Sequence, residues 1–271
     1  MKLRKVNIFI TVIALVSIIG LIFSVYKIVE WKVYSNKTNK QIYNISDISN
    51  IKEIKDDKNT EIIKQDEIEK TNPYWDYIKI PLIDVDFNEL KNINTSTVGW
   101  VQVGGTNINY PIVQSDDNSY YLNHSFDKSY NTAGWVFMDY RNKVEEFDKN
   151  TIIYAHGRHD EIMFGSLKNI IKNDWYSNSN NYIIKFSTEY ENTLWQVISI
   201  YRIETTSDYL NTKFITNEEF INFANTLINR SAFDFNTSIN SNDKILTLST
   251  CYNDKEKVVM HAKLIKRASK N

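Results

Sequence analysis

Apolar residues form one long unbroken stretch near the start of this chain and only short runs after it. The stretch extends from Val6 to Tyr26 and follows a basic N-terminus. Roughly 20 such residues span a bilayer as a helix, whereas the core of a signal peptide is usually shorter. The pattern therefore predicts a transmembrane anchor over residues 6–29, with residues 1–5 in the cytoplasm because basic clusters favour that side. A cleaved signal peptide is the alternative.

Residues 30–73 have a different character and are rich in Lys, Asp, Glu, Asn and Ile. Several isoleucines, among them Ile48, Ile51 and Ile54, recur at loosely helical spacing with charged residues between them. We interpret this region as a partly helical, solvated extracellular stalk. A disordered tether is the alternative, because the apolar content is low. The pair Asn72-Pro73 marks the end of the region.

Residues 74–271 consist of short apolar runs separated by polar turns, as expected for one further domain. Strands are predicted at Trp100–Val103, Ile108–Val113, Gly134–Asp139, Thr151–Ala155, Tyr182–Ser187, Leu194–Arg202, Lys244–Thr250 and Val258–Ile265. Short helices are predicted at Phe87–Lys91, Met163–Lys168 and Thr216–Asn229. The last helix begins with a capping box, Thr216 and Glu219. Many closely spaced strands with few helices predict a mainly β fold, a closed or nearly closed barrel.

Composition narrows the possible functions. The net charge is −1, so the chain lacks the electrostatic footprint of a nucleic-acid-binding protein, and no nucleic acid partner is expected. The chain has a single cysteine, Cys251, which excludes an intramolecular disulfide in a domain predicted to lie outside the cytoplasm. This cysteine is therefore either an inert packed residue or a free reactive thiol.

Cys251 ends the run Ile245–Cys251, which alternates like a strand. Leucines occupy one face, and Thr247, Ser249 and Cys251 occupy the other, so we expect the sulfur on the more polar face at the strand end. A loop with two lysines follows at once. Thiolate character is promoted where a thiol lies in the open beside cations. The pattern favours a reactive thiol, and a packed core cysteine is the alternative.

His156 ends a second β-branched run, Thr151–Ala155, and is followed by Gly157. If this strand pairs in parallel with the strand of Cys251, both side chains emerge at the same edge of the sheet. A cysteine–histidine pair can then act on a peptide bond. The thiolate attacks the carbonyl carbon, and the imidazole carries the proton to the leaving amine.

Three other histidines are available. His124 lies in a polar turn and His261 in the middle of a predicted strand, and we interpret both as hydrogen-bonded residues without a catalytic role. His159 follows His156 by three residues in a charged loop and is a weaker contender for the proton-carrying role.

These residues resemble the sortase family, specifically its class B. The resemblance covers roughly residues 74–267, and the Thr-Leu-x-Thr-Cys motif with an upstream histidine is its most specific part. The segments that carry it are Gly99-Trp100-Val101, Tyr110–Gln114, Asp117–His124, Gly134–Asn142, Tyr154-Ala155-His156-Gly157, Met163–Leu167 and Thr247–Cys251.

The resemblance implies an eight-stranded sortase barrel, in which the helix predicted at Thr216–Asn229 precedes the cysteine strand. It implies a membrane-tethered cysteine transpeptidase of Gram-positive bacteria that uses no cofactor or metal. Such an enzyme cleaves a C-terminal sorting signal, LPxTG-like or NPxTN-like, of a secreted protein. It then joins the new carboxyl end to a peptidoglycan amine through a thioacyl-enzyme. By the match, Cys251 is the nucleophile and His156 the acid/base.

One position departs from the family pattern. The family places an arginine near the active site at the start of the strand after the cysteine, and this chain has Lys257 there. Lysine keeps the charge but loses the planar, multi-donor fork of arginine. Three interpretations follow: Lys257 substitutes as the oxyanion-stabilising cation, an arginine such as Arg158 or Arg202 enters from elsewhere, or the enzyme is impaired. We favour the first, because oxyanion stabilisation chiefly requires a positioned positive donor.

Two further functions remain compatible with the sequence. A cysteine protease that releases its product to water would use the same residues, and only an assay with an amine acceptor separates it from a transpeptidase. A degenerate, non-catalytic surface protein is suggested by the missing arginine alone, and the intact Cys251 and His156 argue against it.

Overall fold

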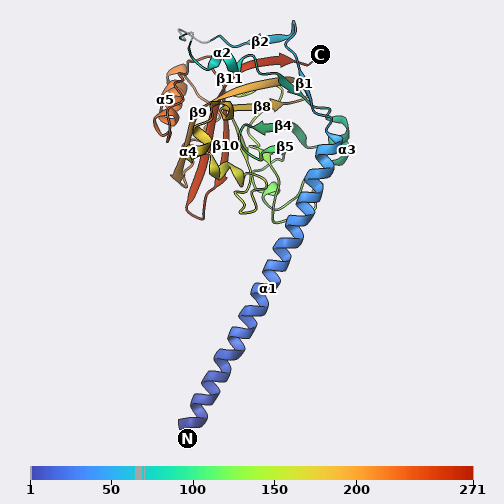
Figure 1. The fold of residues 1–271 in the computed structure, drawn as a ribbon, viewed down its shortest axis with the longest axis vertical. Helices are drawn as coiled ribbons and strands as arrows, with labels where there is room; N and C mark the ends of the chain where they lie inside the picture. Colours follow the sequence, from blue (N-terminus) through green and yellow to red (C-terminus); the bar gives the residue numbers. More distant parts are fainter. Residues whose placement is uncertain (1, 65–68, 70, 271) are drawn as a thin grey trace.

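The computed structural model describes residues 2–64, 69 and 71–270, with side chains described from Ile8 onward. Figure 1 shows a long N-terminal helix, α1 (Lys2–Ile48), that extends away from a β-barrel decorated with short helices. The amino-terminal half of α1 projects away from the barrel, whereas its carboxyl-terminal half packs against it.

Eight strands close into a ring. In order around it they are β10 (Ile245–Cys251), β7 (Asn150–Tyr154), β6 (Phe137–Met138), β5 (Asn109–Gln114), β4 (Thr97–Val103), β8 (Ile183–Ser187), β9 (Glu191–Glu204) and β11 (Glu256–Ser269). Strand β11 pairs back onto β10, which closes the barrel. The pairs β5–β6 and β7–β10 are parallel, and the other neighbours are antiparallel. The predicted eight-stranded, mainly β barrel is confirmed.

The remaining elements lie around this barrel. They are β1 (Lys52–Ile54), β2 (Thr60–Ile62), α2 (Tyr74–Tyr77), β3 (Leu82–Asp84), α3 (Asn88–Ile93), α4 (Asn173–Tyr176), α5 (Asn217–Asn229) and 3-10 turns at Tyr120–Leu122, Ser166–Asn169 and Ser179–Asn181. Strand β2 extends the sheet beyond β11, and β1 pairs with β3. Two strands from the region assigned to the stalk thus pair with the rest of the fold, and the domain boundaries themselves stay a prediction.

Most predicted elements are present, and two are shorter than expected. Strand β6 begins only at Phe137, because Gly134 has a φ of +63°, outside the strand region. The turn predicted as a helix from Met163 begins only at Ser166, because Met163 has a φ of 54° and cannot start a right-handed helix. Both shifts come from backbone conformations that the apolar pattern does not reveal.

The predicted N-cap of α5, Thr216, is confirmed, whereas the Glu219 carboxylate reaches the amide one residue before the N-cap. The Thr216 hydroxyl accepts a hydrogen bond from the Glu219 amide at 3.1 Å, and the Glu219 carboxylate accepts one from the Ile215 amide at 2.8 Å. The apolar face of α5 is buried in a cluster with residues of β9, β10 and β11. The segment that carries α5 therefore covers the outer face of these strands, including the strand that ends at Cys251.

Candidate active site

The strands that end at Cys251 and His156 are neighbours. Strands β7 and β10 pair in parallel, with Ser249 opposite Tyr154, so the two following residues of each strand continue side by side. The Thr250 hydroxyl donates to the carbonyl oxygen of Ala155 at 2.8 Å and joins the two ends. The parallel pairing on which the sequence argument depended is confirmed, and it brings the two residues to the same edge of the barrel.

Gly157 allows the two strand ends to approach this closely. A Cβ added at Gly157 would lie 2.0 Å from the carbonyl oxygen of Cys251 and 2.9 Å from the Thr250 hydroxyl. No side chain fits at such distances. Glycine is therefore required directly after His156 by the packing of the two backbones, and not by an unusual φ.

Lys257 lies directly across from the cysteine. Strand β11 returns antiparallel to β10, with Lys257 opposite Cys251 in the register. The Lys257 Nζ donates to the Cys251 Sγ at 2.8 Å, and both residues are partly buried. The structure therefore brings together the cation and the thiol that the sequence placed six residues apart.

His156 is held by the segment before β6. Its Nε2 lies 2.7 Å from the carbonyl oxygen of Leu122. A carbonyl oxygen only accepts, so Nε2 carries the proton and Nδ1 is the nitrogen with the free lone pair in the neutral ring. Gly134 packs against the ring, since a Cβ there would lie 3.1 Å from the His156 Cδ2. These contacts fix both the tautomer and the orientation of the imidazole.

A second lysine, Lys168, reaches the site and was not singled out in the sequence. Its Cε would lie 2.6 Å from a Cβ added at Gly157, and the same Cβ would meet the carbonyl oxygen of Cys251. Burial lowers the pKa of Lys168, and the negative charge of the Cys251 thiolate opposes that shift. The only sequence signal was its position directly after the Met163–Leu167 block, which carried no chemistry of its own.

The polar face of β10 is covered everywhere except at its end. Thr247 and Ser249 are buried. The Ser249 hydroxyl is 2.9 Å from the Tyr209 hydroxyl, and the Thr247 hydroxyl is 2.8 Å from the His261 Nδ1. The polar residues of this face serve internal hydrogen bonds because the segment carrying α5 lies over them. Only the last residue, Cys251, is partly exposed.

The other histidines lie elsewhere. His261 is fully buried, with its Nε2 2.8 Å from the Tyr201 hydroxyl, and burial followed by the charge of Arg230 lowers its pKa to about 3. His124 stacks on Tyr120, and its Nδ1 is 2.7 Å from the Tyr120 carbonyl oxygen. His159 is exposed on the loop after His156.

Both arginines that were considered as alternatives to Lys257 are held by carboxylates. The Arg158 Nε donates to Asp160 at 2.9 Å. The Arg202 Nε donates to Glu256 at 2.8 Å, and its guanidinium lies 3.9 Å from the centroid of the Tyr252 ring. These pairings keep both guanidinium groups engaged, whereas Lys257 contacts the sulfur directly.

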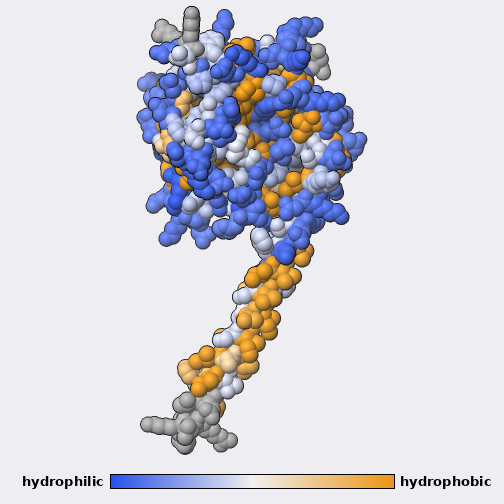
Figure 2. All heavy atoms as spheres, viewed as in Figure 1, coloured by the Kyte–Doolittle hydropathy of each residue, from blue (hydrophilic) through white to orange (hydrophobic). Residues whose placement is uncertain are grey.

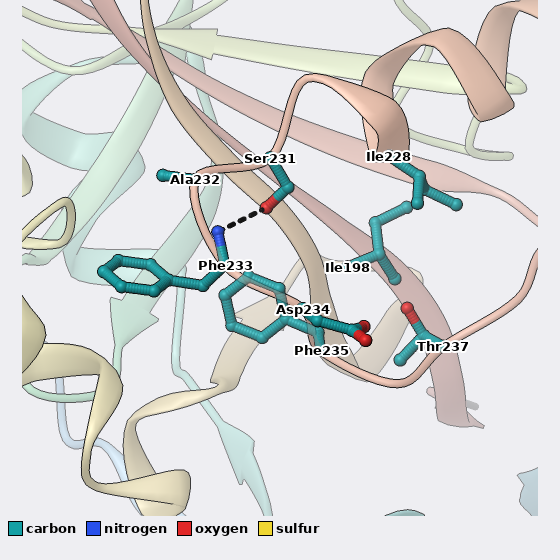
Figure 3. Close-up of a pocket in the computed structure, with 8 residues that line it drawn as sticks. All are labelled: Ile198, Ile228, Ser231, Ala232, Phe233, Asp234, Phe235 and Thr237. Carbon is teal, nitrogen blue, oxygen red and sulfur yellow. Dashed lines mark hydrogen bonds between the residues drawn. The ribbon is translucent and has the colours of Figure 1, made fainter.

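The hollow in Figure 3 is a different feature. It has a volume of about 290 Å³ and lies beside the carboxyl end of α5, lined by Ile198, Ile228, Ser231, Ala232, Phe233, Asp234, Phe235 and Thr237. None of these residues belongs to the strand ends described above. A second hollow of similar volume lies next to the turn that follows Cys251, and it is formed by Glu204 and residues Asn253–Glu256. Among the described residues, no group of three His, Cys, Asp or Glu side chains could hold a metal ion.

The arrangement can support acyl transfer by a thiol. It combines a nucleophile at a strand end, an imidazole with a defined free nitrogen on the adjacent strand, and a positive donor that touches the sulfur. These are the parts needed for nucleophilic attack, proton transfer and charge stabilisation at a carbonyl.

Comparisons with known proteins agree with this chemistry. A family model described as Sortase domain matches residues 101–265. Sortase B of Staphylococcus aureus is 34% identical over 184 residues, which cover 66% of this chain and 75% of that protein. Sortase B of Listeria monocytogenes is 33% identical over 185 residues, covering 66% and 74%.

Solved structures extend the similarity to the fold. A Staphylococcus aureus sortase B–substrate complex is 34% identical, with a TM-score of 0.62 over 66% of this chain and 84% of the other. A structure of Bacillus anthracis sortase B is 30% identical, with a TM-score of 0.68 over 86% and 99%.

Proposed function

The chain belongs to the sortase family, class B, and on that premise we propose that it cleaves a C-terminal sorting signal and attaches the cleaved protein to a peptidoglycan amine. The observation that carries the proposal is the contact of 2.8 Å between the Lys257 Nζ and the Cys251 Sγ, beside the strand that ends at His156. A relative solved as a sortase B–substrate complex supports a peptide substrate for this site. The LPxTG-like or NPxTN-like signal remains part of the proposal.

The first half-reaction is acylation of Cys251. The Cys251 thiol gives its proton to the His156 Nδ1, and the resulting thiolate attacks the carbonyl carbon of the scissile bond while the carbonyl electron pair moves onto oxygen. As the tetrahedral adduct collapses, the protonated His156 Nδ1 gives its proton to the leaving nitrogen, the C–N bond breaks and a thioester remains on the sulfur. Nδ1 is assigned this role because the Nε2 proton is engaged by the Leu122 carbonyl oxygen.

The second half-reaction resolves the thioester. An amine attacks the thioester carbonyl, His156 Nδ1 takes the proton that the amine loses, and the C–S bond breaks to restore the thiolate. The product is a new amide bond, which is what separates transpeptidation from hydrolysis. Since one of the similar solved structures is a sortase B complexed with triglycine, this peptide is a suitable acceptor probe.

Lys257 supplies positive charge in both half-reactions. In the resting site its ammonium donates to the sulfur and stabilises the thiolate. An ammonium has three donors, so it can also donate to the oxygen that becomes negative once the sulfur forms a bond to carbon. The lysine thus performs the task that the family gives to an arginine, with a point charge in place of a planar fork.

The apolar end of α1 supports membrane anchoring. Its side chains from Ile8 to Val29 are exposed, and Figure 2 shows them as a continuous hydrophobic surface below a largely hydrophilic barrel. The helix is long and apolar enough to cross a membrane. Our proposal places the N-terminus in the cytoplasm and the catalytic domain outside the cell, where the secreted proteins and the peptidoglycan amine are found.

The test uses the purified full chain and quenched fluorescent peptides of both signal types. Wild-type protein should cleave one of them, and with triglycine present the new carboxyl end should be recovered as a triglycine adduct. Mass spectrometry of the enzyme without acceptor should find the peptide fragment on Cys251. Cys251→Ala should abolish cleavage while leaving the circular dichroism spectrum unchanged. A product that carries only a free carboxylate at saturating triglycine would make the chain a protease, and an active Cys251→Ala variant would overturn the nucleophile.

A further inference from the structure

The carboxyl-terminal half of α1 is docked on the barrel along one face. Buried and partly buried residues follow one face of this half of the helix, and they include Tyr34, Ser35, Thr38, Gln41, Ile42, Ile45 and Ile48. Ser35 is 6% exposed and Thr38 is 0% exposed, so two buried polar side chains lie in this contact. Each is satisfied by a polar side chain of the barrel, and both partners belong to segments that hold His156.

The first contact reaches the loop that follows His156. The Ser35 hydroxyl donates to the Asp160 carboxylate at 2.7 Å. Asp160 also accepts from Arg158, whose guanidinium lies 5.5 Å from the centroid of the Trp31 ring. Burial raises the pKa of Asp160, but the hydrogen bonds from Arg158 and Ser35 outweigh it and hold the pKa below its usual value. Asp160 is therefore a carboxylate at neutral pH, and it ties the loop to the helix.

The second contact reaches the segment that accepts the His156 hydrogen bond. The Asn131 side-chain amide donates to the Thr38 hydroxyl at 2.9 Å. The backbone of Asn131 in turn bonds to Asn123 at 2.9 Å and to Gly134 at 3.0 Å. This segment begins next to Leu122, whose carbonyl oxygen holds the His156 Nε2, and ends at the glycine that packs against the imidazole.

We propose that Ser35 and Thr38 of α1 are positioning residues for His156. The helix holds the loop on one side of the imidazole through Asp160, and it holds the segment on the other side through Asn131. This inference rests on the proposed cysteine–histidine mechanism. It goes beyond that mechanism because it makes the helix that carries the membrane anchor part of the active-site scaffold.

The anchor and the docking residues belong to one continuous helix (Figure 1). Ser35 lies eight residues after Lys27, the first charge after the apolar stretch, which is about 12 Å along the helix axis. The turn between β10 and β11 lies at the end of the barrel on the side of the amino-terminal half of α1 (Figure 1). The docking contact therefore also sets the height of the catalytic edge above the predicted membrane surface.

The test compares two double variants of the full chain in lipid nanodiscs. Ser35→Ala with Thr38→Val removes both polar contacts. Asn36→Ala with Asn39→Val changes two polar residues of the same turn that are exposed, and it is the matched control. We expect kcat of the docking variant to fall about tenfold or more while KM changes little. A small displacement of a catalytic group slows the chemical step far more than it weakens substrate binding. The control should behave as wild type. Ser35→Thr keeps the hydroxyl at this position and should keep most of the wild-type rate.

Two further measurements separate positioning from general damage. Because Cys251 is the single cysteine, its alkylation rate reports the thiol site alone and should stay unchanged in the docking variant. In a His156→Ala background the docking variant should add little further loss, because it acts through His156. Wild-type kcat in the docking variant, or an equal loss on top of His156→Ala, would overturn the inference. If the wild-type chain itself shows no thioester or His156→Ala keeps full activity, the proposed mechanism fails instead.

Discussion

A methyl group at Gly157 tests how the strand ends that carry Cys251 and His156 are held together. In Gly157→Ala the new Cβ would lie 2.0 Å from the carbonyl oxygen of Cys251 and 2.6 Å from the Cε of Lys168. The Lys168 side chain can rotate away, but the oxygen belongs to the backbone of Cys251, the proposed nucleophile. Ordinary contact begins at 3.4 Å, so the two backbones must separate by about 1.4 Å at the residue next to His156.

This displacement is large on the scale of catalysis. Misplacing catalytic groups by 1 Å can reduce the rate by about 10²-fold. We expect kcat of Gly157→Ala to fall by at least that factor. Overpacking of this kind destabilises a fold by about 1–3 kcal/mol, so a measurable decrease in Tm should accompany the loss while the β-sheet circular dichroism signal persists.

The assay is cleavage of the signal peptide, with Tm measured in parallel. Gly20→Ala is the matched control, because a Cβ at Gly20 meets nothing within 4 Å, and it should keep the wild-type rate. Near wild-type turnover by a folded Gly157→Ala enzyme would refute the reasoning. It would mean that the ends of β7 and β10 separate without consequence, so that their close approach does not set the geometry of the reaction.

Three other outcomes can be checked with the same protein. Lys257→Met should lower kcat by about 10²–10³-fold, the effect of losing one oxyanion donor, and Lys257→Arg should keep or raise it; a normal rate for Lys257→Met would reduce the lysine to a structural contact. His156→Ala should lose at least ~10²-fold and His159→Ala little, and the reverse ranking would exchange their roles. The pKa of His261 is about 3 in the folded protein against an ordinary 6.5, so the folded state binds fewer protons between these values. The free energy of unfolding should therefore fall as pH drops from 6.5 toward 3, by up to about 1.4 kcal/mol per pH unit. Urea unfolding at a series of pH values should show a weaker pH dependence of this free energy for His261→Gln.

Local sequence patterns were sufficient for most of the barrel. Alternating and β-branched runs located the strands, and the residues that end two of them, Cys251 and His156, are the ones that meet at one edge. Lys257 could also be placed, because the strand after a short turn returns antiparallel and a residue at its start faces the last one of the strand before it. Each of these inferences depends on neighbours in the chain or on strand geometry with a fixed period.

Other parts of the site carried no comparable signal. The carbonyl oxygen of Leu122 accepts from His156, yet a backbone carbonyl is present at every residue and its use cannot be read from side chains. Lys168 looks like any surface lysine until the fold brings it across Gly157. The cover over the polar face of β10 had no signal either, because Tyr209 lies over it from a segment 40 residues away.

The sequence by itself determined the membrane-length helix, the succession of strands and the residue types available for the proposed acyl transfer, because these depend on local periodicity and residue chemistry. Only the tertiary structure decided which nitrogen of His156 is free and which cation touches the thiol. It alone showed that α1 reaches the histidine loop, since Ser35 and Asp160 are 125 residues apart. Such contacts form only when the whole barrel packs, because their partners come from segments whose separation along the chain leaves no pattern.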